Sequence, residues 1–132
     1  MKLITLVILI ITGSFSFCSN INDVKPIEEK EGKYFNKTKN SYINLEKIEN
    51  DTILGHHCFI LNEGNRIDCC IDEDFSIKLV HHNGNDYEGI LVSCYDDDDE
   101  YKVKLHFENE YIVFSFIENN HPFMSKIEKF YK

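Results

Sequence analysis

Residues 51–72, DTILGHHCFILNEGNRIDCCID, contain the pattern that decides the fold. Two apolar runs, Ile53 to Leu61 and Ile67 to Ile71, flank the polar residues 62–65. Within this polar cluster, Gly64 can adopt the positive φ of a tight turn. The pattern predicts an antiparallel β-hairpin that carries three of the five cysteines.

The register of this hairpin predicts its disulfide. A two-residue loop at 63–64 places Cys58 opposite Cys69, where Cβ atoms are about 4.5–5.5 Å apart, near the separation that a disulfide needs. A slip of one residue would bring Cys58 beside Cys70 instead. Neighbouring strand residues point to opposite faces, so Cys69 and Cys70 should take different partners. We expect Cys58–Cys69 and Cys70–Cys94, the second adding about 3 kcal/mol in the chain-entropy model.

The rest of the chain repeats the alternation of strand and turn. It shows no segment of helical period, and the Asn83-Gly84 pair is a strong hairpin signal. Phe75, Ile77 and Leu79 are expected on one face of a strand, against Ser76 and Lys78. The sequence predicts an all-β fold, an antiparallel meander of about eight strands forming a small disulfide-bonded barrel or sandwich. The expected strands are 42–48, 53–61, 67–71, 75–82, 87–95, 101–107, 111–117 and 126–131.

The N-terminal residues 1–18, MKLITLVILIITGSFSFC, have the pattern of a signal peptide. One lysine precedes an apolar run that is too short for a stable membrane span. Cleavage after Ser16 would release a soluble protein, whereas lipidation of Cys18 would anchor a lipoprotein. Phe15 and Phe17 depart from the residues usual before a lipidated cysteine. We favour the lipoprotein because it leaves an even number of cysteines for disulfides in an oxidising compartment.

The remainder divides into a tether and one domain. Residues 19–40 are polar and lack a periodic pattern, so they are expected to form a flexible tether. As a random coil, 22 residues would span on the order of 26 Å. Residues 41–132 are expected to form a single β domain.

The charge of the chain restricts its partners. The formal charge is −9, and without residues 1–18 the chain has 13 basic and 23 acidic residues, a charge of −10. Such a surface disfavours nucleic acid and anionic lipid and is compatible with a basic protein or a cation. Solubility alone would also explain the charge. The densest acidic run, Asp96, Asp97, Asp98, Asp99 and Glu100, is the expected contact surface for that partner. Calcium binding is the alternative for this run, although it lacks the ligand spacing of a calcium loop.

Several residues are of the types that bind zinc, namely His56, His57, Cys58, Asp68, Cys69, Cys70, His81 and His82. Their spacing matches no zinc pattern, and exported cysteines are usually oxidised. We therefore expect no metal and no cofactor. The sequence contains no nucleophile motif or phosphate-binding glycine loop, so enzyme activity is not expected.

The segments Gly55–Cys58 and Arg66–Cys70 together form a G-x-H-C then R-I-D-C-C hairpin, which resembles small bacterial envelope lipoproteins. In architecture the chain is similar to the membrane-bound inhibitors of c-type lysozyme, although their binding motifs are not found here. This resemblance implies a lipid-anchored eight-stranded barrel that binds a basic enzyme. The acidic charge, the acidic run 96–100 and the lack of catalytic motifs lead to the hypothesis of a protein-binding role at the cell envelope, as an inhibitor or an immunity factor. The alternative is a lipocalin-like barrel that holds a small apolar ligand among its Phe and Tyr side chains.

Overall fold

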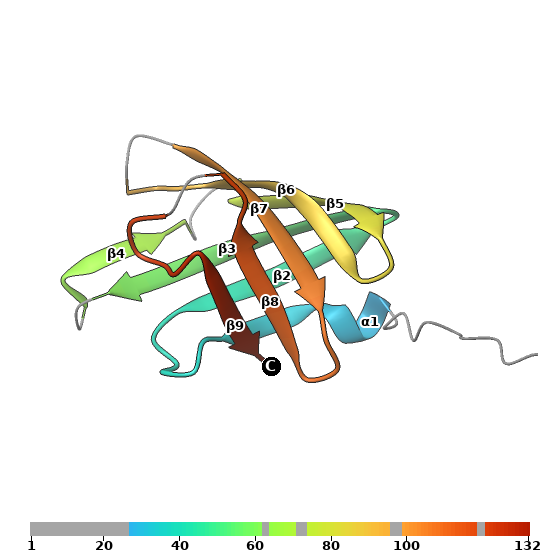
Figure 1. The fold of residues 1–132 in the computed structure, drawn as a ribbon, viewed down its shortest axis with the longest axis horizontal. Helices are drawn as coiled ribbons and strands as arrows, with labels where there is room; N and C mark the ends of the chain where they lie inside the picture. The colour runs from blue at the N-terminus through green and yellow to red at the C-terminus, as the bar shows by residue number, and fades with distance from the viewer. Residues whose placement is uncertain (1–26, 62–63, 71–73, 96–98, 119–120) are drawn as a thin grey trace, which may run out of the picture.

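A computed structural model describes residues 27–61, 64–70, 74–95, 99–118 and 121–132. These residues form one antiparallel sheet and a four-residue helix, α1 (Figure 1). No helix within these ranges has the length and apolar character needed to cross a membrane. The elements are α1 (Ile27–Lys30), β1 (Gly32–Phe35), β2 (Tyr42–Glu49), β3 (Thr52–Leu61), β4 (Arg66–Cys69), β5 (Ile77–Asn83), β6 (Asp86–Val92), β7 (Glu100–Phe107), β8 (Tyr111–Phe116) and β9 (Ile127–Tyr131).

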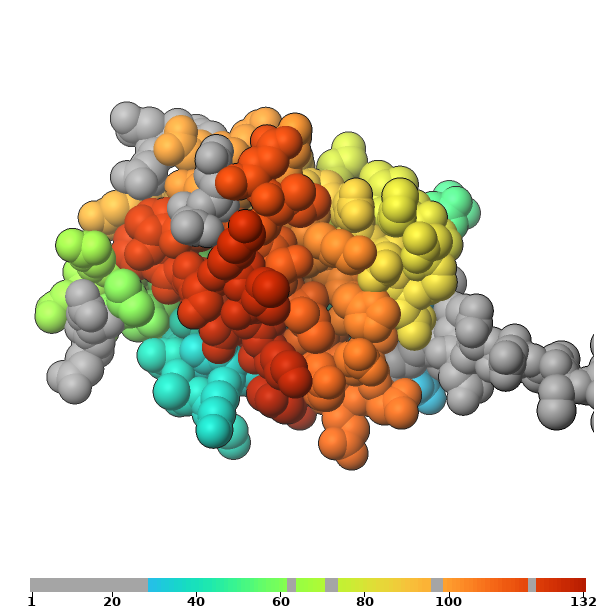
Figure 2. Space-filling view, viewed as in Figure 1, coloured from blue at the N-terminus to red at the C-terminus, as the bar shows by residue number. Residues whose placement is uncertain are grey.

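The sheet closes into a barrel. Its order is β2-β1-β9-β8-β7-β6-β5-β3-β4, and β2 also pairs with β3. The ring therefore contains every strand except β4, and it closes where Phe35 of β1 pairs with Tyr131 of β9. β7, β8 and β9 lie on the face of the barrel that Figure 2 shows. The prediction of an all-β meander is confirmed, and of its two forms the molecule adopts the barrel.

The β3–β4 hairpin is present with the predicted register. Cys58 pairs with Cys69, Phe59 with Asp68, and the last pair before the turn joins β3 to Arg66. Gly64 in the turn has a φ of +94°, a conformation that costs glycine little and other residues more.

The predicted tether is wrong for residues 27–40. β1 pairs along its whole length with β2, and Tyr34 is wholly buried in the core. The hydroxyl of Tyr34 donates to the carbonyl oxygen of Lys30 (2.8 Å), which fastens α1 to β1. Only four residues long and flanked by charge, β1 is too short for a period of two to stand out. Residues 19–26 lie outside the described ranges.

The barrel interior is filled by apolar side chains. In β7, Tyr101, Val103, Leu105 and Phe107 are buried and alternate with more exposed residues, as their spacing predicts. The largest wholly buried rings come from five different strands and surround the barrel axis. They are Tyr34, Phe59, Phe107, Phe114, Phe116 and Phe130.

Candidate functional site

The candidate site lies where two strands, β4 and β5, pair with different parts of the same edge of β3. On the same edge of β3, β5 pairs with Thr52–Gly55 and β4 pairs with Cys58–Leu61. His57 lies between the two pairings, opposite the connection from β4 to β5. Its carbonyl oxygen accepts from the Cys70 N–H (3.4 Å), and its own N–H donates to Ser76 Oγ (3.2 Å). The hydroxyl oxygen of the buried Ser76 thus accepts the hydrogen bond that a backbone carbonyl of a paired strand would otherwise accept from the His57 N–H.

This arrangement corrects the predicted face of residues 75 and 76. Phe75 is exposed and Ser76 is buried, the reverse of the expected alternation. The regular strand begins only at Ile77, so period-two alternation does not extend to the two residues before it. Ser76 turns inward because its hydroxyl pairs with His57.

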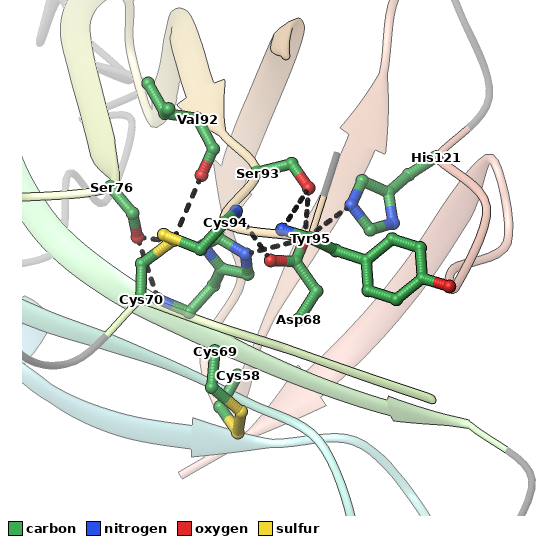
Figure 3. The surroundings of a disulfide bond; sticks show 11 residues. Cys58, Asp68, Cys69, Cys70, Ser76, Val92, Ser93, Cys94, Tyr95 and His121 are labelled. Atoms are coloured by element: carbon green, nitrogen blue, oxygen red, sulfur yellow. Dashed lines mark hydrogen bonds and ion pairs between the residues drawn. A yellow bond between two sulfur atoms is a disulfide. The ribbon is translucent and has the colours of Figure 1, made fainter. Parts of the chain in front are cut away.

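Asp68 is the centre of a buried polar cluster (Figure 3). Its side chain is fully buried, on the inner face of β4. Oδ1 accepts from the Cys94 N–H (2.8 Å), and Oδ2 accepts from the Ser93 hydroxyl (2.9 Å) and from His121 Nε2 (2.8 Å). His57 Nε2 lies 3.1 Å from the same Oδ2. One carboxylate therefore joins β3, the β6–β7 connection and the β8–β9 connection.

The hydrogen bonds assign the protonation of His121. Its Nδ1 accepts from the Phe123 N–H (3.2 Å), so the proton is on Nε2, which donates to Asp68. The His121 ring stacks on Phe116 with centroids 5.4 Å apart and meets the Phe59 ring edge-on. The β8–β9 connection is thereby held over the aromatic core.

His57 is less completely satisfied. Nδ1 lies 2.8 Å from Ser76 Oγ, whereas Nε2 is buried and makes no hydrogen bond in the described structure, despite its closeness to Asp68. Burial lowers the pKa of His57 by more than the neighbouring Asp68 raises it. The ring is consequently neutral at pH 7.

Asp68 remains ionised in this setting. Burial on its own would raise the pKa of the carboxyl group, but hydrogen bonds from His121 and Ser93, together with the close approach of His57, lower it well below the ordinary value. The cluster thus contains a buried negative charge stabilised by donors from distant parts of the chain.

Both predicted disulfides are present, on opposite sides of the β3–β4 hairpin (Figure 3). Cys58–Cys69 joins directly opposed residues with Cα atoms 4.0 Å apart. Cys70–Cys94 joins the end of β4 to the β6–β7 connection, with Cα atoms 5.6 Å apart. Cys70 is buried, whereas Cys94 is exposed, so the second bridge reaches from the cluster to the surface.

The predicted acidic contact surface lies in the β6–β7 connection, shortly after Cys94. Asp99 and Glu100 are exposed at the start of β7, and the Asp99 carbonyl oxygen accepts from the Ser93 N–H (2.9 Å). Asp96 to Asp98, and the predicted lipidation residue Cys18, lie outside the described residues. The base of the acidic connection is therefore fixed from both sides.

The zinc-type residues of the sequence are only partly brought together. Ligand atoms of His57, Asp68 and Cys70 all lie within 4.8 Å of one another, although Cys70 is in a disulfide. His56 is on the other face of β3, with Nδ1 3.0 Å from Glu46 Oε1. His81 lies at the far end of β5, where Nε2 is 3.0 Å from the Gly84 carbonyl oxygen.

Sequence reasoning did not find Ser76, Ser93 or His121. Ser93 and His121 lie 25 and 53 residues from Asp68, and Ser76 lies 19 residues from His57, its partner. A serine or a single loop histidine carries no spacing signal. The predicted Cys70–Cys94 bridge was the one sequence signal that placed the β6–β7 connection beside the β3–β4 hairpin.

No protein family, curated protein sequence or solved structure matches this chain. The resemblance to envelope lipoproteins and to lysozyme inhibitors stays a prediction from the residues quoted for it.

Proposed function

We propose that this chain is an exported, lipid-anchored binding protein of the bacterial cell envelope, which binds a basic protein through its acidic β6–β7 connection as an inhibitor or immunity factor. One observation carries the proposal. The base of the acidic connection is fixed by the Cys70–Cys94 bridge and by the bonds of Ser93 and Cys94 to the buried Asp68. A loop with a fixed base loses less conformational entropy when it binds a partner.

The charge of the molecule supports a basic partner. The chain has a formal charge of −9, and Asp99 and Glu100 are exposed beside three further aspartates in sequence. Complementary charge speeds encounter and selects partners, and this effect weakens as salt is added. A salt-dependent association is therefore expected.

The interior of the barrel supports a surface role over the lipocalin-like alternative. Nineteen buried hydrophobic residues, many of them aromatic, form one core cluster inside the ring. A ligand-holding barrel needs interior space that these side chains occupy.

Burial also supports binding over catalysis. His57, Asp68 and His121 have the residue types of a catalytic site, but all three side chains are completely buried. A general base must come within hydrogen-bond reach of its substrate. A structural role for this cluster accounts for its burial without invoking a reaction.

The test uses residues 19–132 with c-type lysozyme and with the basic proteins of an envelope extract. Wild-type protein should bind a partner with an affinity that falls with salt. Changing Asp96–Asp99 to Asn and Glu100 to Gln should weaken binding by about tenfold or more.

The matched control removes five exposed acidic groups elsewhere. It combines the substitutions E49Q, D51N, E108Q, E110Q and E118Q. This variant should bind within a few-fold of wild type. An equal loss of affinity in the two variants would show that binding depends only on the overall negative charge and not on the run 96–100. The absence of any salt-sensitive partner would reject the proposal.

The proposed membrane anchoring and disulfide state have a separate test. Intact mass of the protein from host membranes should show a diacyl or triacyl addition at Cys18 and no free thiol. An unlipidated chain with titratable thiols at Cys58, Cys69, Cys70 and Cys94 would overturn the anchored, oxidised form.

A further inference from the structure

We propose that reduction of the Cys70–Cys94 disulfide creates a zinc site formed by His57, Asp68 and Cys70. Zinc is bound in proteins by imidazole nitrogen, carboxylate oxygen and thiolate sulfur, and these three residues supply one of each. In the oxidised protein the third ligand is absent, because the sulfur of Cys70 is bonded to that of Cys94.

The three ligand atoms would have to move only slightly closer together to hold a metal ion. The three ligand atoms already lie within 4.8 Å of one another, and His57 Nε2 and Asp68 Oδ2 are 3.1 Å apart. Ligand bonds of about 2.0–2.3 Å in a tetrahedron place neighbouring ligand atoms roughly 3.3–3.8 Å apart. The nitrogen–oxygen pair is thus near its final separation, and the sulfur is the atom that has to approach.

A second observation points to a ligand at the same place. His57 Nε2 is fully buried and faces Asp68, and it makes no hydrogen bond with any residue that the structure describes. Its other ring nitrogen is held by Ser76 Oγ (2.8 Å), and Asp68 is held by the Cys94 N–H and by His121. Metal-binding histidines and carboxylates are usually oriented by such outer partners.

The exposure of the disulfide gives the order of the chemical steps. A dithiol reductant can attack the exposed Cys94 sulfur, which breaks the S–S bond, forms a mixed disulfide at Cys94 and leaves a Cys70 thiolate inside. The second thiol of the reductant displaces Cys94 as a thiol and closes the reductant's own disulfide. Two electrons and two protons thereby pass to the cysteines. Zinc then takes the Cys70 sulfur as thiolate, and one proton is released.

The test uses the C94S variant of residues 19–132, which frees Cys70 without a reductant and keeps Cys58–Cys69. Titration with Co²⁺ should give one equivalent with a sulfur-to-cobalt charge-transfer band and tetrahedral visible bands, both removed by Zn²⁺. Oxidised wild type and C70S, whose free thiol is Cys94, should show neither band. X-ray absorption of zinc-loaded C94S should show one sulfur ligand.

Ser76, which lies against the other ring nitrogen of His57, provides a second test of the site. Ser76→Ala in the C94S background should weaken zinc affinity by about 10- to 100-fold, since loss of such partners has this effect. Far-UV circular dichroism checks that each variant keeps its barrel, and reduced wild type provides a second route to the free Cys70 thiol. Binding without a sulfur ligand, equal binding by C70S, or loss of the barrel in both C94S and reduced wild type would overturn the site.

Discussion

At the scale of single residues, Asp68 explains why three distant segments meet. A carboxylate removed from water costs several kcal/mol unless donors replace the lost solvent. Here the donors are His121, Ser93 and the Cys94 N–H, none of which belongs to the β3–β4 hairpin. Asp68 therefore stabilises the fold only when those segments are correctly placed.

Asp68→Asn should lower the free energy of unfolding by about 3 kcal/mol. The amide can still accept from the Cys94 N–H, but its NH₂ group would face the Nε2–H of His121, two donors without an acceptor. Urea denaturation with disulfides intact measures the change. Asp74→Asn, at an exposed position, is the control and should change stability by less than about 0.5 kcal/mol. Equal stability of D68N and D74N would contradict this role.

The pH dependence of stability tests His57. Burial holds the pKa of His57 below its ordinary 6.5, although Asp68 favours its protonation while His121 and His56 oppose it. As pH falls through 6.5 the unfolded chain binds a proton that the folded chain does not, so the free energy of unfolding falls, by up to about 1.4 kcal/mol per pH unit. A further loss should begin below about pH 4 as the unfolded chain protonates Asp68, whose folded pKa is lowered.

The measurement is urea denaturation from pH 7.5 to pH 5 for wild type and His57→Gln. Glutamine keeps a neutral polar side chain beside Asp68 but does not titrate, so the slope of stability against pH should be smaller in the variant. The same slope in both proteins would show that His57 is not the group responsible.

At the scale of elements, the parts foreseen from the sequence are those whose signals are local. The register of the β3–β4 hairpin and the Cys58–Cys69 pair follow from one turn and a period of two. β1 is too short to display that period, and Ser76 and His121 are positioned by contacts with residues far along the chain. The sequence thus predicted an all-β barrel or sandwich and the two bridges, but it did not predict the cluster that those bridges help to hold.

Removing each disulfide should have a different cost. The bridged residues are separated by 24 positions in Cys70–Cys94 and by 11 in Cys58–Cys69. In the chain-entropy model the first contributes about 3.4 kcal/mol and the second about 2.8 kcal/mol. Urea denaturation of C70A/C94A and C58A/C69A measures the two losses. A larger loss for C58A/C69A would contradict the anchoring role of the bridge to the β6–β7 connection.

At the scale of the whole molecule, the barrel is a closed ring with a solid interior. Wholly buried rings such as Phe59, Phe114 and Phe130 lie within 6.4 Å of one another, centroid to centroid. Such packing supports the proposal that the protein binds its partner through its outer surface and connections, and not through its interior.

A fluorescent fatty acid should therefore show no saturable binding to residues 19–132. A single apolar ligand would have to displace the buried aromatic side chains of the core. Fluorescence titration with a lipocalin as positive control checks this expectation. Binding that saturates at one equivalent would instead favour the interior-ligand alternative.

The most direct single measurement is the hydrogen exchange rate of the Cys94 backbone amide, which donates to the buried Asp68. This amide should exchange slowly in wild type, and in D68A, where the side-chain acceptor is removed, it should lose more protection than the amides of β6, which report global unfolding. That result would establish that a buried carboxylate holds the acidic connection. Rapid exchange of the Cys94 amide in wild type, or an equal loss along β6, would contradict it.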